Sequence, residues 1–147
     1  MSKDKRELRS YLSRLDNEKI SLYIIKGDEL LYSSNKSGIS PIVEAVEKVG
    51  ISKLSGSVVV DKIVGKAAAL TISYFKARKV FTHLISKSAV EILQQNGVLY
   101  EYERLTKEIK AKNGLGICPF EMAVKEVGDP KDGYERLKRI LNLVDRG

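Results

Sequence analysis

Residues 57–86 read SVVVDKIVGKAAALTISYFKARKVFTHLIS, and this stretch decides the fold. Ser57–Val60 is a short apolar run typical of a buried strand, and Asp61 is a suitable cap for a helix over the alanine-rich run after it. Lys79–Ile85 is apolar on both faces, as expected for a central strand of a covered sheet. A strand, a helix and a strand in this order form a right-handed crossover between parallel strands. The stretch therefore predicts an α/β fold.

Outside this stretch, helical and strand-like patterns alternate along the chain. Those before it are an amphipathic helix over 3–15, a hairpin of 20–26 and 29–33 around Gly27-Asp28, and a helix from Ser40-Pro41 to Gly50. After it come a helix that begins with a Ser88/Glu91 capping box and ends at Gly97, a strand over 98–103, and a helix from Cys118-Pro119 to Gly128. The last helix is capped by Asp129-Pro130. Its inward-facing residues are expected to be Tyr134, Leu137, Ile140, Leu141 and Val144. The order α-β-β-α-β-α-β-α-β-α-α predicts one three-layer α/β/α domain over 1–147, with a mixed sheet and helices on both faces.

Composition excludes several classes of protein. A chain of 147 residues with 43% hydrophobic and 31% charged residues is typical of a soluble globular domain. One cysteine and one histidine exclude an intramolecular disulfide and a zinc cluster, so no metal and no cofactor are expected. The longest uncharged apolar runs are too short to cross a bilayer, and the charged N-terminal segment does not resemble a signal peptide. We expect a cytoplasmic protein that does not bind membranes.

The charge is uneven along the chain. The net charge is +7, and residues 62–112 hold ten basic and four acidic residues, which gives +6 for that segment alone. Such a segment favours an anionic partner, such as a nucleotide, a phosphorylated metabolite or nucleic acid, although no aromatic RNA-binding motif accompanies it. Solubility alone is an equally good explanation. The sequence does not indicate an oligomeric state.

The first candidate site is the start of the helix predicted after Asp61. The junction between a strand and the following helix is where α/β proteins commonly bind ligands, and free N–H groups there favour an anion. Lys62 and Lys66 would supply positive charge, and Gly65 would let a backbone or a ligand approach closely. A P-loop is excluded, because Ala67 replaces the required serine or threonine. The alternative is that Asp61 is only a helix cap and that the alanines at 67–69 pack under neighbouring elements.

The second candidate site is the glycine-rich segment that leads to Cys118. Gly114 and Gly116 indicate a backbone close to another group, and Cys118 stands at a predicted helix N-cap that favours the thiolate. Glu121, at the third helical position, could accept a bond from the N–H of the cap. We expect this segment to lie beside Asp61–Ala69. The alternative is a small buried cysteine.

The lone histidine, His83, lies on the predicted central strand. We interpret it as a core histidine with satisfied ring nitrogens, because a cysteine–histidine pair with Cys118 would have to join distant elements. It is therefore not included in either candidate site.

Three motifs of the chain resemble one known family. They are VVDKIVGKAAA at 59–69, HLIS at 83–86 and GLGICPFE at 114–121. Together they resemble the prokaryotic family called domain of unknown function 1893, over about residues 20–141. The resemblance implies a fold similar to the cytidine deaminase superfamily, with residues 1–19 as its leading helix. It implies Asp61, Lys62, Lys66 and Cys118 as shared site residues.

The zinc chemistry of deaminases is not implied by this resemblance. Ser40-Pro41 stands where the His-x-Glu helix of those enzymes would begin, and Asp61–Gly65 stands where Pro-Cys-x-x-Cys would be. Three functions remain open. The first is an enzyme acting on a nucleotide-like or other anionic small molecule, with Cys118 as nucleophile and Asp61 or Lys62 as its proton partner. The second is a non-catalytic module that binds such an anion. The third is a regulatory or nucleic-acid-associated basic protein.

Overall fold

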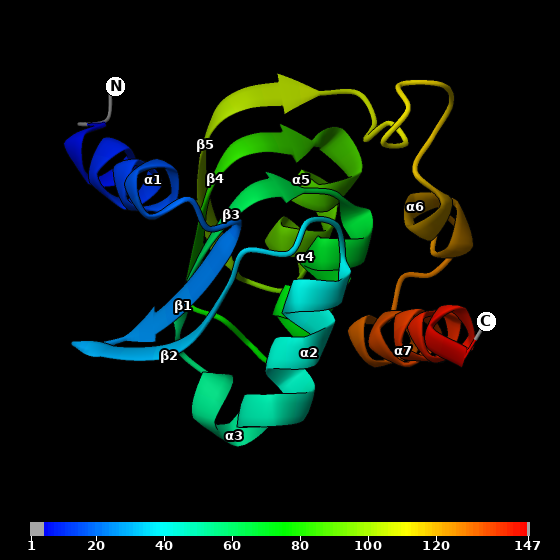
Figure 1. The fold of residues 1–147 in the computed structure, drawn as a ribbon, viewed down its shortest axis with the longest axis horizontal. Coiled ribbons are helices and arrows are strands. Elements are labelled where there is room, and N and C mark those ends of the chain that lie inside the picture. Colours follow the sequence, from blue (N-terminus) through cyan, green and yellow to red (C-terminus); the bar gives the residue numbers. More distant parts are fainter. Residues whose placement is uncertain (1–4, 147) are drawn as a thin grey trace.

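The computed structural model describes residues 5–146, with side chains described for residues 5–142. A five-stranded sheet of order β2-β1-β3-β4-β5 lies at its centre (Figure 1). The strands are β1 (Leu22–Lys26), β2 (Glu29–Ser34), β3 (Val58–Val64), β4 (Lys79–Ser86) and β5 (Leu99–Thr106). β1 runs antiparallel to β2 and β3, whereas β3, β4 and β5 are mutually parallel. The predicted mixed sheet, its opening hairpin and its alternating α/β order are confirmed.

Helices cover both faces of the sheet, as predicted. α1 (Arg6–Glu18) covers one face alone and buries Leu8, Leu12 and Leu15 against β1, β3 and β4. α2 (Ser40–Val49), α4 (Lys66–Tyr74) and α5 (Lys87–Gln95) cover the other face. α7 (Pro130–Arg146) packs on the outer side of α4 and α2, so it adds a layer beyond the predicted three (Figure 1). No helix among residues 5–146 is both long and apolar enough to cross a membrane.

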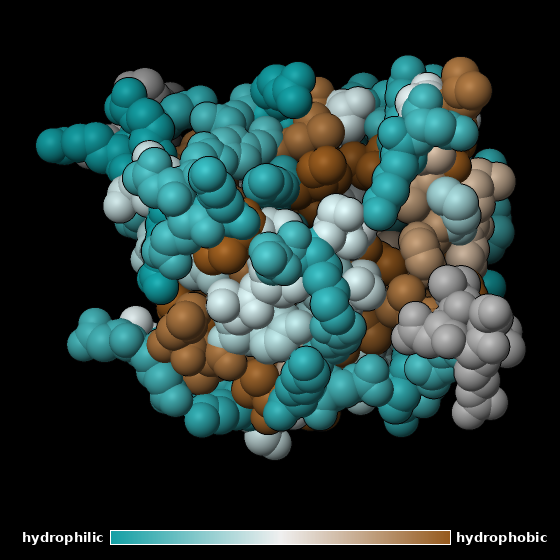
Figure 2. Space-filling view, in the orientation of Figure 1, coloured by the Kyte–Doolittle hydropathy of each residue, from teal (hydrophilic) through white to brown (hydrophobic). Residues whose placement is uncertain are grey.

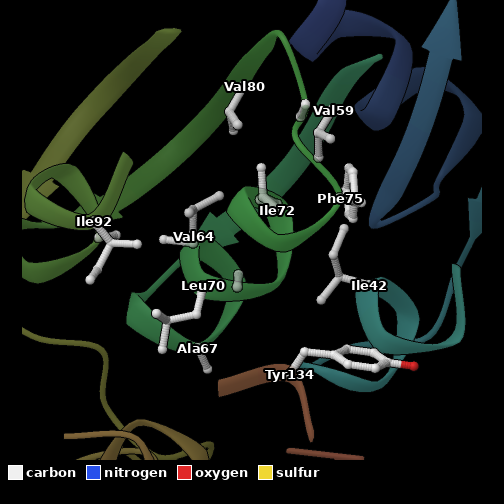
Figure 3. Close-up of a cluster of buried hydrophobic side chains, with 14 of the residues drawn as sticks. Ile42, Val59, Val64, Ala67, Leu70, Ile72, Phe75, Val80, Ile92 and Tyr134 are labelled. Atoms are coloured by element: carbon white, nitrogen blue, oxygen red, sulfur yellow. The ribbon is translucent and has the colours of Figure 1, made fainter. Parts of the chain in front are cut away.

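The main core lies between the sheet and α2, α4 and α5. Figure 3 shows Val59 and Val80 of the strands facing Ile72 of α4, while Tyr134 reaches the same cluster from α7. The alanines at the start of α4 are fully or almost fully buried, because a small side chain is what allows other elements to approach this helix closely. The sequence had offered this packing as the alternative to a functional role for the alanines.

The prediction that a helix begins after Asp61 is wrong. β3 continues through Val64, and α4 begins at Lys66 with Gly65 as its N-cap residue. Asp61 pairs with Leu22 of β1 and with Thr82 of β4, so it lies in the middle of the central strand. The physical reason is that the β-branched Ile63 and Val64 extend the strand and bury Val64, and this outweighs the capping tendency of an aspartate.

Other element boundaries also differ from the prediction. Ser86, and not Ser88, caps α5, because its hydroxyl accepts the N–H of Ala89 at 3.2 Å. α6 (Pro119–Ala123) ends five residues before Gly128, and the short helix α3 (Ile51–Leu54) was not predicted.

The predicted cap of the last helix is confirmed, since Asp129 accepts the N–H of Asp132 at 3.0 Å. Tyr134 and Leu137 are buried, Ile140 and Leu141 are half-buried, and the side chain of Val144 lies outside the described residues.

α7 crosses α4 at Gly133. A Cβ atom at this position would lie 2.8 Å from Cδ1 and 2.9 Å from Cβ of Leu70, which is fully buried and cannot move aside. We expect Gly133→Ala to destabilise the protein by about 1–2 kcal/mol, although alanine has the higher helix propensity. Urea unfolding measures this, with the exposed Glu135→Ala in the next turn as the control. A Gly133→Ala protein as stable as the control would contradict the close crossing.

Candidate functional site

The N-terminus of α4 is occupied by a carboxylate of the protein itself. The backbone N–H groups of Lys66 and Ala67 each donate to Glu121 of α6, to Oε1 and Oε2 respectively, at 2.7 Å. The positive end of a helix dipole favours such an anion. Glu121 was predicted to bond within its own helix start, so its partner is a different helix from the one expected. The amides that the sequence offered to a ligand are therefore already bonded.

Gly65 is the residue that makes this contact possible. A Cβ atom there would lie 2.3 Å from Glu121 Oε1 and 2.8 Å from Cγ1 of Ile109. The predicted close approach at Gly65 is confirmed, and the approaching groups are Glu121 and Ile109. Ile109 also accepts the backbone N–H of Cys118 at 3.0 Å. Residues 65–67 thus lie beside Glu121 and Ile109. The predicted proximity of Asp61–Ala69 and Gly114–Glu121 therefore holds for the start of α4 but does not include Lys62, and no sequence signal indicated Ile109.

Lys66 contributes a cation at the same place. Its Nζ donates to the backbone oxygen of Lys125 at 2.7 Å. A carbonyl oxygen holds the ammonium in position without neutralising its charge. The pKa of Glu121 is nevertheless raised, because burial outweighs the two N–H donors and the charge of Lys66.

Asp61 is the most unusual titratable group of the sheet. It is half-buried, and burial raises the pKa of its carboxyl to about 7, although the backbone N–H groups of Lys62 and Ile63 act in the opposite direction. No basic side chain among residues 5–146 offsets this burial. It pairs with Leu22 of β1 on one side and with the buried Thr82 of β4 on the other. A carboxyl of this kind is half ionised near neutral pH.

Lys62 does not join Asp61. It lies inside β3 and not in the first turn of a helix, its side chain is exposed, and its backbone N–H donates to Ser21 at 3.1 Å. Successive side chains of a strand point to opposite faces, so Lys62 is on the face of Val60 and α1. The geometry therefore removes the predicted contact between Lys62 and the segment of Cys118, which packs at the start of α4.

Cys118 is half-buried and is the N-cap residue of α6, as predicted. Its side chain makes no capping bond, and α6 is only five residues long. The dipole that was expected to act on the thiol therefore comes from a single turn. Gly114 and Gly116 have φ of 77° and no atom within 4 Å of a Cβ position, so they serve the turn of a small hairpin and not a close approach.

Both ring nitrogens of His83 have polar partners, as predicted, but the side chain is half-buried at the surface and does not lie in the core. Its Nδ1 contacts Glu103 of β5, and its Nε2 lies 3.2 Å from Asp16 of α1. Neither acidic partner could be identified from the sequence, because both lie far away along the chain. Within residues 5–146 no group of three or more histidine, cysteine or acidic side chains is arranged to hold a metal ion.

Apolar side chains reach the surface next to this region. Figure 2 shows hydrophobic surface over the carboxyl ends of the strands, framed by hydrophilic residues. Ile63 of β3 and Leu105 of β5, each next to the last residue of its strand, are 49% and 46% exposed. Polar, cationic and apolar groups thus meet at the edge of the sheet where β3 leads into α4.

Comparisons with known proteins give one family. The model of the domain of unknown function DUF1893 matches residues 11–141. The crystal structure of a DUF1893 family protein from Thermotoga maritima is 31% identical and superposes with a TM-score of 0.81, over 94% of this chain and 92% of that chain. RibD of Acinetobacter baumannii is 13% identical with a TM-score of 0.48, over 66% of this chain and 36% of that chain. No protein of curated function matches.

Proposed function

The chain belongs to the DUF1893 family, and from this premise we propose that it binds a nucleotide-like anionic small molecule where β3 leads into α4. In this proposal Asp61 exchanges a hydrogen bond or a proton with the ligand, and Lys66 attracts its negative charge. Proton transfer by Asp61 would make the protein an enzyme, whereas hydrogen bonding alone would make it a binding module.

The carboxyl of Asp61 is the observation that carries the proposal. A half-buried carboxyl without a cationic partner lowers the stability of the fold, and such groups concentrate at functional sites. A carboxyl with a pKa of about 7 can donate and accept hydrogen bonds at neutral pH. This suits the edge of a heterocyclic base, which presents donors and acceptors side by side.

Lys66 supports an anionic ligand. Its ammonium is held by the carbonyl of Lys125 and acts on Glu121 only through space, without a salt bridge among the described residues, so it can also attract a phosphate. The amides at the start of α4 are not available in the same way, because Glu121 holds both of them. The ligand is therefore expected to depend on a side-chain cation, in contrast to a P-loop.

Thermal unfolding with the four ribonucleoside monophosphates and their nucleosides tests the proposal. We expect at least one monophosphate to raise the melting temperature more than its nucleoside does, since a ligand at a hundredfold its Kd stabilises by about 2.7 kcal/mol. Asp61→Asn and Lys66→Met should each reduce this shift, and the exposed Asp28→Asn should leave it unchanged. No shift with any of the four would contradict the proposal.

An enzyme with Cys118 as its nucleophile is the second candidate. It is supported by the position of Cys118, whose N–H is bonded to the residue that packs on Gly65. This candidate predicts that iodoacetamide labels Cys118 in the native protein faster than in urea-unfolded protein, because only an activated thiolate reacts faster than a free thiol. Labelling that is slower in the native protein would show Cys118 to be structural.

A further inference from the structure

The connection from β5 to α7 contains a long segment with no buried side chain. Residues 107–123, here called the strap, are exposed or half-buried throughout, and α6 within it buries none of its residues. Val124 and Val127, directly after the strap, are buried again. In Figure 1 the strap is the yellow to brown segment that leaves β5 and reaches α6. Connections of this length in compact domains are commonly functional loops, and segments that bury little apolar surface open at low free energy.

The strap has an internal structure of its own. The N–H of Cys118 donates to the carbonyl oxygen of Ile109, and the N–H of Ala111 donates to that of Gly116, both at 3.0 Å. An antiparallel bridge lies between these two bonds and completes a small hairpin. These bonds all join residues of the strap to one another. The strap can therefore move away from the rest of the chain as one piece without losing them.

Glu121 makes the shortest hydrogen bonds between the strap and the two helices that it touches. Its carboxylate accepts the N–H groups of Lys66 and Ala67 of α4 at 2.7 Å. Arg136 of α7 donates to the carbonyl oxygen of Ala123 at 3.2 Å. The positive end of α4 and the charge of the carboxylate strengthen the first two bonds. The hydrogen-bonded attachment of the strap to α4 thus depends on one side chain.

Burial opposes this attachment. It raises the pKa of Glu121, although both N–H donors and the charge of Lys66 lower it. A carboxylate that loses its hydration in the closed form regains it when the strap lifts. The closed form is therefore favoured by less than the two short bonds alone indicate.

Glu121 also affects which anions the start of α4 accepts. In the closed form its carboxylate holds both N–H groups and repels a second negative charge. When Glu121 leaves, two N–H groups become free next to the ammonium of Lys66, which a carbonyl oxygen holds. Free N–H groups at a helix start, together with a cation, bind phosphate groups. The open form is consequently the better receptor for an anionic ligand.

We propose that the strap is a lid over the start of α4, that Glu121 is its latch, and that the lid opens as one piece to admit an anionic ligand. The opening itself does not depend on the function proposed above. The admission of a ligand rests on that function, because it assumes that the ligand binds at Lys66.

Amide hydrogen exchange of the full chain, measured by NMR without nucleotide, tests the opening. We expect protection factors at Lys66 and Ala67 at least tenfold lower than at Ala69, whose N–H donates to Gly65 inside α4 at 2.9 Å and stays bonded when only the strap lifts. Cys118 should also be protected at least tenfold more than Lys66, because its bond lies inside the strap. Equal protection at Lys66, Ala67 and Ala69 would contradict a separate opening of the lid. Protection at Cys118 as low as at Lys66 would contradict movement as one piece.

Glu121→Gln tests the latch. The variant keeps the shape of the side chain but loses the charge, and its NH2 group cannot accept an N–H. We therefore expect the protection factors of Lys66 and Ala67 to fall at least a further tenfold. The exposed Glu126→Gln, in the turn after α6, is the matched control and should leave them unchanged. Circular dichroism checks that both variants are folded. Unchanged protection in Glu121→Gln would overturn the role of Glu121 as the latch.

Equilibrium binding of the four ribonucleoside monophosphates tests the admission of the ligand. The apparent Kd is inversely proportional to the open fraction, so Glu121→Gln should lower it at least fivefold and Glu126→Gln should not change it. An unchanged or higher apparent Kd in Glu121→Gln would overturn this part of the inference. If none of the four binds to the unmodified chain, the proposed function fails, while the exchange experiment still decides whether the lid opens.

Discussion

Asp61→Asn is expected to make the protein more stable at pH 8 and to reduce the stabilisation by nucleotides. Asparagine has the shape of the carboxyl and no charge to desolvate, so the cost of burying the ionised group disappears. At 1.36 kcal/mol per pH unit, the gap between the ordinary value of 3.8 and a pKa of about 7 corresponds to about 2–4 kcal/mol after allowance for solvent screening. Urea unfolding measures the gain, which corresponds to roughly 5–12 °C in melting temperature.

The pH dependence has a defined sign. Below about pH 4 the Asp61 carboxyl is neutral in the folded and unfolded chains, so it costs nothing. Between pH 4 and 7 the Asp61 carboxyl loses its proton in the unfolded chain but keeps it in the folded chain, so the free energy of unfolding falls as pH rises. Above pH 7 the carboxyl is ionised in both states, and the decrease in the free energy of unfolding no longer changes with pH. Asp61→Asn should remove this slope. The exposed Asp28→Asn should retain it. An Asp61→Asn protein that is less stable than the unmodified chain at pH 8 would contradict this account.

Gly65→Ala is expected to detach Glu121 from α4. The added Cβ would lie 2.3 Å from Glu121 Oε1 and 2.8 Å from Ile109, so the carboxylate must leave the N–H groups of Lys66 and Ala67. Losing these charge-assisted bonds and straining the packing should cost about 2–4 kcal/mol in urea unfolding. Backbone strain does not contribute, because φ of Gly65 is −98°, which any residue adopts.

Two variants separate this effect from general glycine replacement. Gly128→Ala has no atom within 4 Å of the new Cβ and should change stability by less than about 1 kcal/mol. Glu121→Gln keeps the side-chain shape but loses the charge, so it should have an intermediate effect. If Gly65→Ala is no more destabilising than Gly128→Ala, then Glu121 does not hold the start of α4.

The order of elements could be predicted because apolar periodicity depends on residues close in sequence. The hairpin at Gly27-Asp28, the crossover from β3 to β4 and the amphipathic α1 all follow from local patterns. The start of α4 could not be predicted in the same way. Aspartate caps helices well, and only pairing on both sides of Asp61 shows that the strand continues to Val64.

The candidate site shows the same division. The small residues and the helix starts predicted that the two motif segments lie side by side. The bonds from Lys66 and Ala67 to Glu121 confirm this for the start of α4, whereas Lys62 does not take part. Which groups meet could not be inferred, because Glu121 and Ile109 are more than 40 residues away from Gly65 along the chain. Lys62 was placed incorrectly because an error of a few residues in a helix start moves a side chain to the opposite face of a strand.

The central claim is that Asp61 titrates near neutral pH in the folded protein, and a carbon-13 NMR titration of the aspartate carboxyl groups tests it most directly. The Asp61 resonance is identified by its loss in Asp61→Asn. We expect its chemical shift to change with a midpoint at about pH 7, well above the ordinary value of about 4 for an aspartate carboxyl. A midpoint for Asp61 near 4 would contradict the account, because the carboxyl would then be an ordinary ionised group with no special role in the sheet.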